Sequence, residues 1–502
     1  MLKKFDEYTI LPKHGESDNG PESFDFGGCA DVYLAKNEKE IEKGIKKLYV
    51  LKILKKDKTI NEHQQQAFDK EIDTLLILKN VRDSEKYIPL IYRNQKYNCE
   101  KQNNNEKGTE NQKELNPFYA IDYISNNCLC YYLSLVHFEE NEEIKLTTKL
   151  TTKLLFKKIV EAVKFLHDNN ICHLDLKPDN IMLDKDFNPI IIDFGSVEKL
   201  EPEIKRKIFE DNEKNITLQY ACPELFDEKK EYIDGEKYDC FSLGAILFKL
   251  VTGEFGFNDT INDELYNYIR NGNHGEYWEE IKEQIETKNG NKLNISDEFK
   301  ELYLSMVHPD PTKRKSIEEI LGSGWFKDLE TKDEKEKEKL EKIYKDEFTN
   351  IFNSIKDKHK SFKISEEKLS EGFLMRSLED KEYTLFTEKI KNLIPKKISN
   401  DEIQINPCIK INSDLSAFDI MNYLLLKILE FFQDECIPYE DEYVFEVFFN
   451  KNKKIGSCTM KIELFKYEEK GKYLLEFMRK EGTIEVYYHY FLEIKKMISQ
   501  NL

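Results

Sequence analysis

Two neighbouring segments, residues 173–183 and 191–195, constrain this chain more than any other feature. They read HLDLKPDNIML and IIDFG, and within 21 residues they place two carboxylates, a lysine and a carboxamide: Asp175, Lys177, Asn180 and Asp193. Carboxylate and carboxamide oxygens suit Mg²⁺, and a lysine can neutralise charge on a migrating phosphoryl group. The fold that carries these segments should therefore bring the four side chains to one place.

The overall composition limits the class of protein. A length of 502 residues predicts two or three domains. No run approaches the roughly 18–20 apolar residues of a membrane span, and no apolar stretch follows the basic start as in a secretory signal. The ten cysteines are scattered without a CxxC pair, so we expect reduced thiols and a cytoplasmic location. A net charge of −19 argues against general nucleic-acid binding.

The order of strand-like and helix-like patterns indicates two lobes. Residues 24–95 predict strands and one helix, whose apolar positions 68, 72, 75 and 76 share a face, and 117–124 return to strand character. The polar, low-complexity segment 97–116 predicts a surface insertion. Helical patterns dominate residues 150–325. We therefore expect a small β-rich lobe followed by a larger helical lobe.

The sequence changes character after residue 326. Residues 328–347 carry opposite charges at i,i+4 spacing and predict a solvated linker helix, and we assign 327–400 as a charged linker with an uncertain helical region. Residues 401–502 predict a small α+β domain. Its predicted elements are a helix near 415–433, strands near 443–449, 458–466, 472–479 and 483–488, and a last helix near 490–499.

The two opening segments resemble the catalytic loop and the metal loop of eukaryotic protein kinases of the serine/threonine type, and the resemblance covers about residues 20–326. It implies an α+β, bilobal protein kinase fold with a small β-rich N-lobe and a larger helical C-lobe. We place an N-terminal extension at 1–23, the kinase domain at 24–326, its N-lobe at about 24–124 and its C-lobe at about 125–326.

The resemblance implies a catalytic role for each matching residue. Asp175 would orient the substrate hydroxyl, and Lys177 would contact the γ-phosphate of ATP. Asn180 and Asp193 would hold Mg²⁺. The remaining catalytic matches are Lys52 on a strand, which would grip the α- and β-phosphates, Glu71 as its ion-pair partner, and Thr217 on the catalytic floor. The implied reaction transfers the γ-phosphate of ATP to serine or threonine hydroxyls of proteins.

The resemblance also implies a nucleotide pocket. Its residues would be Asp25, Gly27, Gly28, Ala30, Val32, Val50, Lys52, Ile121, Asp122, Ile124, Leu183 and Asp193. Within this set the glycine-rich loop departs from the family pattern, because Asp25 and Ala30 stand at two of its three glycine positions. Asp25 adds negative charge near the nucleotide, which keeps a second interpretation open: a pseudokinase scaffold that binds nucleotide weakly or not at all.

Leu174 is a second departure, because most family members carry arginine there. That arginine places a positive charge beside the catalytic aspartate, and a phosphate on the activation segment neutralises it. Leucine cannot pair with phosphate, so we expect activity that does not depend on loop phosphorylation through this contact. Four further matches have structural roles in the family: Glu224 in ACPE, Asp239, Gly244 and Arg314.

Residues 443–500 resemble the kinase-associated C-terminal domain, most closely in the stretch YLLEFMRKEGT from residue 473. A polo-box-like module is the alternative. The resemblance implies binding to anionic lipid, with membrane association, or an inhibitory intramolecular contact. Residues 451–502 hold 11 Lys and Arg against 7 Asp and Glu, which fits a basic face, although a solvated lysine-rich surface explains the same count.

Overall fold

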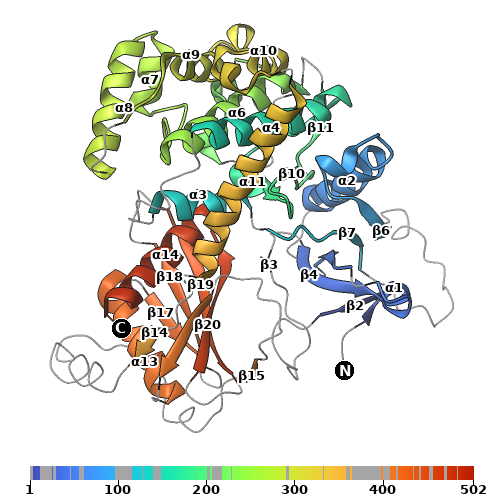
Figure 1. The fold of residues 1–502 in the computed structure, drawn as a ribbon, viewed down its shortest axis with the longest axis vertical. Helices are drawn as coiled ribbons and strands as arrows, with labels where there is room; N and C mark the ends of the chain where they lie inside the picture. Colours follow the sequence, from blue (N-terminus) through green and yellow to red (C-terminus); the bar gives the residue numbers. More distant parts are fainter. Residues whose placement is uncertain are drawn as a thin grey trace. The chain divides into compact units, whose positions relative to one another are not determined.

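A computed structural model of the chain divides into two compact units. One comprises Met1–Lys55, Phe118–Tyr123 and Asn353–Leu502, and the other Lys56–Pro117 and Ile124–Phe352. Figure 1 draws the helices and strands of both units, coloured along the chain. The structure describes residues 4–11, 25–26, 30–45, 47–55, 62–95, 116–126, 128–138, 149–200, 204–205, 217–227, 229–289, 293–331, 333–357, 362–364, 397–398, 408–413, 416–432, 435–439, 443–450, 456–467, 472–482 and 484–501.

The first unit contains the β-rich N-lobe. Its strands are antiparallel and follow the order β1 (Lys4–Phe5), β2 (Tyr8–Ile10), β4 (Ala30–Asn37), β5 (Tyr49–Leu54) and β7 (Phe118–Asp122), with β3 (Asp25–Phe26) beside β4 and the short helix α1 (Glu38–Glu42) after it. The strand character predicted for this region is confirmed, and Asp25 of β3 pairs with Val32 of β4. Residues 4–10, which the sequence assigned to an extension, add two strands to this sheet.

A second sheet in the same unit forms the C-terminal domain. Its strand order is β14 (Phe362–Ile364), β16 (Cys408–Ser413), β20 (Lys472–Glu481), β19 (Cys458–Tyr467), β18 (Val444–Phe449) and β17 (Glu435–Pro438), and β15 (Lys397–Ile398) pairs with β19. Its helices within the described residues are α13 (Ala417–Phe432) and α14 (Ile484–Asn501). Both lie on one face of the sheet, because Tyr490 of α14 contacts Phe432 of α13 and Phe449 of β18.

One predicted element of this domain is wrong. The strand expected near 483–488 is the beginning of α14, and strands β16 and β17 were not expected. The run IEVYY favours a strand by local propensity, but tertiary packing overrides it. The buried residues Tyr487, Phe491, Ile494 and Ile498 recur at helical spacing, and the Tyr487 hydroxyl donates to the backbone oxygen of Phe477.

The second unit begins with the predicted amphipathic helix and continues into the helical C-lobe. Of the four apolar positions predicted to share a face of helix α2 (Glu62–Leu78), Phe68, Ile72 and Leu75 are buried and Leu76 is half-buried. After β6 (Ile91–Gln95) come α3 (Leu129–Phe138), α4 (Lys149–Asp168), α6 (Gly235–Thr252), α7 (Glu264–Arg270), α8 (His274–Asn289), α9 (Asp297–Met306), α10 (Ile317–Leu321) and α11 (Glu334–Asp357), with α11 continuing five residues past the unit boundary. The expected fold class, a β-rich lobe, a helical lobe and a small α+β domain, is confirmed.

Helix α6 is the centre of the helical lobe. Every residue from Tyr238 to Leu250 is buried, as expected of a helix surrounded by other elements. The Asp234 side chain accepts a hydrogen bond from the Lys237 amide at its start, and Gly253 ends it at φ +80°. Among the described residues, no helix is both apolar and long enough to cross a bilayer.

The short elements between α4 and α6 hold the predicted catalytic segments. They are β8 (Ile171–Cys172), the 3₁₀ turn η3 (Pro178–Asn180), β9 (Ile181–Leu183), β10 (Pro189–Ile191), β11 (Glu198–Lys199), β12 (Ile204–Lys205), the turns η5 (Leu218–Tyr220) and η6 (Pro223–Phe226), and β13 (Tyr232–Ile233). β9 and β10 form an antiparallel hairpin of three residue pairs.

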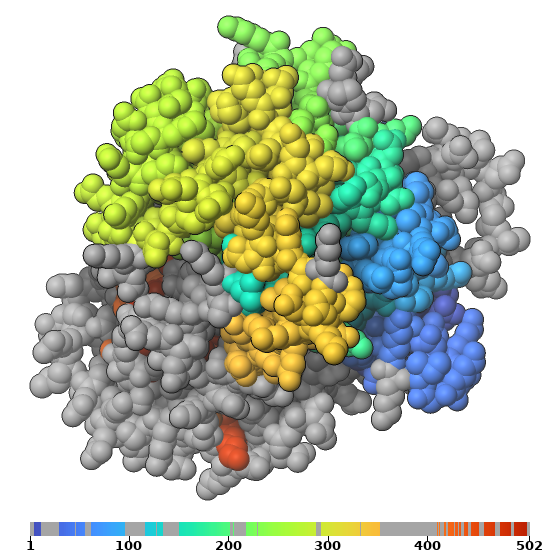
Figure 2. Space-filling view, turned by 45° about the horizontal axis from the view of Figure 1, so that its top comes forward, coloured from blue at the N-terminus to red at the C-terminus, as the bar shows by residue number. Residues whose placement is uncertain are grey.

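The linker helix differs from its prediction. A solvated helix was expected over 328–347, but α11 begins at Glu334 and buries two aromatic side chains, Tyr344 and Phe348, whose exposed fractions are 0% and 2%. Its outer side is visible at the surface in orange (Figure 2). The charge pattern correctly predicted a helix, but it could not reveal that one stripe of the helix packs against the C-lobe.

Candidate active site

The catalytic loop brings three of the four opening residues together. The Lys177 ammonium donates to both oxygens of Asp175 at 3.0 and 2.8 Å. The Asn180 amide nitrogen donates to the backbone oxygen of Asp175 at 2.8 Å and to its carboxylate at 2.9 Å. Both N–H groups of the carboxamide are thus used locally. The carboxamide oxygen remains as the atom of Asn180 suited to a cation.

Helix α6 fixes the backbone that leads into this loop. The buried carboxylate of Asp239 accepts from the amides of His173 at 2.8 Å and Leu174 at 2.9 Å, and also contacts the His167 ring at 2.8 Å. These contacts hold Leu174 at φ +63°, a region that costs a branched residue energy. The Leu174 side chain is buried. The position that carries arginine in most of the family is thus filled by a buried apolar side chain, which cannot pair with an anion.

The hairpin β9–β10 joins Asn180 to Asp193. Asn180 directly precedes β9, and Asp193 follows β10 by two residues. The amide of Ile192 donates to the Asn180 backbone oxygen at 3.0 Å, and the His173 ring contacts the Ile192 oxygen at 3.1 Å. Asp193 is exposed and has φ +66°. A carboxylate and a carboxamide oxygen on adjoining backbone match the oxygen ligands of Mg²⁺.

The charges of the catalytic loop influence one another. Burial raises the pKa of Asp175, and Lys177 opposes this, but the pKa remains above its ordinary value. Burial lowers the pKa of Lys177, yet the attraction of Asp175 outweighs it, and the pKa of the lysine is raised. Asp193 also raises the pKa of Asp175. Positive charge beside Asp193 would therefore favour the ionised form of Asp175.

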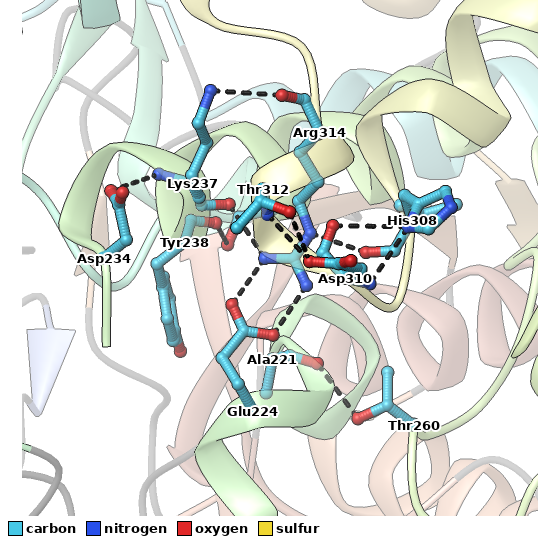
Figure 3. A network of polar contacts seen from close by, with 12 residues as sticks. Ala221, Glu224, Asp234, Lys237, Tyr238, Thr260, His308, Asp310, Thr312 and Arg314 are labelled. Carbon is cyan, nitrogen blue, oxygen red and sulfur yellow. Dashed lines mark hydrogen bonds and ion pairs between the residues drawn. The ribbon is translucent and has the colours of Figure 1, made fainter. Parts of the chain in front are cut away.

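A buried ion pair fixes the segment that follows Thr217. The Arg314 guanidinium donates to the two oxygens of Glu224 at 2.5 and 2.6 Å, and it also donates to the backbone oxygens of His308 and Lys237 (Figure 3). Burial lowers the pKa of Arg314, but the pair with Glu224 more than compensates and the pKa is raised. The half-buried Thr217 directly precedes η5; its role on the catalytic floor remains a prediction.

The N-lobe carries most of the residues that the sequence predicts for the nucleotide pocket. In β4 and β5, Val32 pairs with Lys52, and Val50 pairs with Leu34 on one side and Ile121 on the other. Ala30, Val32 and Ile121 are buried, Val50 and Lys52 half-buried. The Lys52 ammonium lies 5.7 Å from the centroid of the Tyr119 ring, and Asp122 pairs with Lys47 at 2.8 Å. Only the backbone of Asp25 is described, and Gly27 and Gly28 lie outside the described residues.

The predicted pair between Lys52 and Glu71 spans the two units, so it stays a prediction. Glu71 is buried on α2, and Leu183 is buried on β9. Ile124, directly after the segment that carries β7, is half-buried. Their assignment to the nucleotide pocket likewise stays a prediction.

Sequence reasoning missed two contacts around this site. Lys70, next to Glu71 on α2, pairs with Glu198 on β11 at 2.6 Å and so ties the helix to the segment that follows Asp193. The His167 ring is a further contact of the Asp239 carboxylate. Neither residue belongs to a motif. A lysine on a helix and a glutamate on a strand carry no signal until the fold brings them together.

Comparison with known proteins identifies the family. A model of the protein kinase domain matches residues 26–326, and the chain therefore belongs to the protein kinase family. Its relatives include the serine/threonine-protein kinase ppk34 of Schizosaccharomyces pombe, which is 25% identical over 331 residues, 62% of this chain and 86% of that protein. The prediction of a serine/threonine-type protein kinase is thus confirmed at the level of the family.

Two further relatives match shorter segments. The probable serine/threonine-protein kinase fhkC of Dictyostelium discoideum is 31% identical over 198 residues, 38% of this chain and 30% of that protein. The serine/threonine-protein kinase PTK2 of Candida glabrata is 32% identical over 203 residues, 35% of this chain and 26% of that protein. The chain thus spans less than a third of each of these two relatives. The kinase-associated C-terminal domain and the polo-box-like alternative remain predictions.

Proposed function

We propose that this chain is an active protein serine/threonine kinase that transfers the γ-phosphate of ATP to protein hydroxyls with Mg²⁺. The arrangement of Asp175, Lys177 and Asn180 on one loop is the observation that carries the proposal. Asp175 orients the incoming hydroxyl and accepts its hydrogen bond, and Lys177 balances the charge of the γ-phosphate. These two groups already contact each other, so little reorganisation is needed when the substrate arrives.

Asn180 and Asp193 would hold Mg²⁺, which would neutralise charge on the phosphate oxygens when bound. The chain's own residues hold the reacting groups in position. The bond from Ile192 to Asn180 keeps the two ligand-bearing segments in register. Lys52 would contact the α- and β-phosphates, and the hydrophobic residues of β4, β5 and β7 would cover the adenine.

A transfer assay tests this proposal. The full chain is incubated with labelled ATP, MgCl₂ and a generic basic protein substrate, and phosphate incorporation is measured. We expect Asp175→Asn to lower kcat by about 10²–10⁴-fold, the range of a positioned acid–base group. Asp193→Ala and removal of Mg²⁺ with EDTA should each abolish transfer. Asp168→Ala, which removes an exposed carboxylate of α4, should leave the rate unchanged.

The same assay separates the kinase from the pseudokinase scaffold suggested by Asp25 and Leu174. The proposed kinase activity would be overturned if the unaltered chain and Asp193→Ala incorporated equal amounts of phosphate, or if neither incorporated any although both are folded. Nucleotide binding measured in parallel then shows whether a scaffold retains ATP.

We also propose that residues 401–502 act as a regulatory or membrane-targeting domain, through anionic lipid or through an intramolecular contact. The basic composition of residues 451–502 supports this proposal, as do the four adjacent antiparallel strands β17–β20 with two helices on one face.

A further inference from the structure

The turn between β9 and β10 is held by a helix that lies outside the protein kinase family match. Residues 184–188 form this turn, at the end of the hairpin opposite to Asn180 and Asp193. The match ends at residue 326, whereas α11 begins at Glu334. The Tyr344 hydroxyl of α11 donates to the backbone oxygen of Phe187 at 2.6 Å. Tyr344 is completely buried, so this bond is shielded from water.

Aromatic packing surrounds that hydrogen bond. The Phe348 ring stacks on Phe187 with centroids 5.2 Å apart, and it also contacts Tyr344 at 4.9 Å and Tyr132 of α3 at 5.8 Å. Phe187, Tyr132 and Phe348 are all buried. One turn of α11 thus supplies two side chains to a cluster whose other two members come from the C-lobe.

The turn needs such support because its backbone is strained. Phe187 has φ +64°, in a region that bulky residues rarely adopt. Asp184 organises the turn from within, accepting from the amides of Asp186 and Asn188 at 2.8 Å each. The contacts from α11 reach the strained residue itself, at its ring and at its carbonyl oxygen. Strain at a single residue persists where neighbouring structure holds it in place.

Charged side chains near the aromatic cluster also join α11 to the C-lobe. Lys345 of α11 pairs with Asp186 of the turn at 3.2 Å. Glu341 of α11 pairs with Lys158 of α4 at 3.0 Å, and Lys158 donates to Asn188 of the turn at 2.8 Å. Two ion pairs therefore join α11 to the C-lobe close to Tyr344, and both favour the same register of α11 against the hairpin.

We propose that α11 is a positioning element for the metal-binding hairpin, with Tyr344 and Phe348 as its positioning residues. Three residue pairs span only about 10 Å, and such a short hairpin moves as one piece. When α11 fixes its turn, it fixes Asn180 and the approach to Asp193 at the other end. The inference rests on the proposed kinase function, and it assigns to the segment after the matched domain a part in binding Mg²⁺ with ATP.

A pair of tyrosine variants tests the inference within one cluster. Tyr344→Phe removes a hydroxyl that donates to Phe187. Tyr132→Phe removes a buried hydroxyl for which the described part of the chain offers no hydrogen-bond partner, so it is the matched control. We expect Tyr344→Phe to raise the Mg²⁺ concentration that gives half the maximal rate. The increase should be about fivefold, because the loss of one ordinary hydrogen bond changes an equilibrium constant by about that factor. Tyr132→Phe should leave it unchanged.

Hydrogen–deuterium exchange of the full chain supplies a readout that needs no activity. Tyr344→Phe should speed exchange of the hairpin amides, Ile192 included, by about fivefold, with no change in α6. Phe348→Ala should have a larger effect in both assays, and Phe348→Leu should recover part of it. Lys342→Ala, an exposed change on the same helix, should match the unaltered chain.

Several outcomes would overturn the positioning role. One is a rate of amide hydrogen exchange in the hairpin that is the same in Tyr344→Phe and Tyr132→Phe. Another is exchange that accelerates equally in α6 and the hairpin, because α11 would then stabilise the whole lobe without a specific role. A fall in kcat with an unchanged Mg²⁺ requirement would count against it in the same way. An inactive unaltered chain refutes the proposed function, while the exchange experiment still decides whether α11 holds the hairpin.

Discussion

The buried pair between Glu224 and Arg314 gives the strongest stability prediction. The side chains are 2% and 0% exposed and share two short hydrogen bonds. Glu224→Ala leaves a buried guanidinium with only backbone oxygens as acceptors among its described contacts, those of His308 and Lys237. Removing one partner of such a pair costs about 3–5 kcal/mol. At about 2–4 °C per kcal/mol for a domain of this size, Tm should fall by about 6–20 °C.

Thermal unfolding followed by circular dichroism measures this change. The control is Glu318→Ala, which breaks an exposed pair with Lys164, whose side chains are 65% and 32% exposed. Such a pair contributes about 0–1 kcal/mol. The double variant Glu224→Leu with Arg314→Met should recover much of the loss, because neither charge then remains buried. A shift for Glu224→Ala no larger than that for Glu318→Ala would refute the reasoning.

Two further predictions concern regulation. Because the buried Leu174 cannot pair with a phosphate, phosphatase treatment should leave the transfer rate unchanged; loss of activity that returns when residues 197–216 are rephosphorylated would contradict this. If the C-terminal domain targets membranes, the full chain should sediment with phosphatidylserine vesicles and not with neutral ones, less so at high salt; equal sedimentation with both would remove the lipid proposal.

The local parts of the site could be predicted because short spacings determine them. Asn180 follows Asp175 by five positions, and one turn of chain lets the Asn180 carboxamide reach both the carbonyl and the carboxylate of Asp175. The buried face of α2 could be predicted for the same reason, since the helical period places Phe68, Ile72 and Leu75 together.

Contacts between distant segments could not be predicted in this way. Nothing near Lys70 in the sequence indicates Glu198, and nothing near Tyr344 indicates Phe187. The run IEVYY after Gly482 favours a strand locally, yet it begins α14, because burial against the sheet outweighs intrinsic propensity.

The sequence by itself determined the family, the serine/threonine type and the residues proposed for phosphoryl transfer, because these reside in motifs whose spacing is local. Only the tertiary structure decided that the linker helix is partly buried and that it holds the turn opposite the proposed metal ligands. The physical reason lies in Tyr344 and Phe348. In the sequence they are two aromatic residues in a charged segment, and their role exists only where the strained Phe187 meets them.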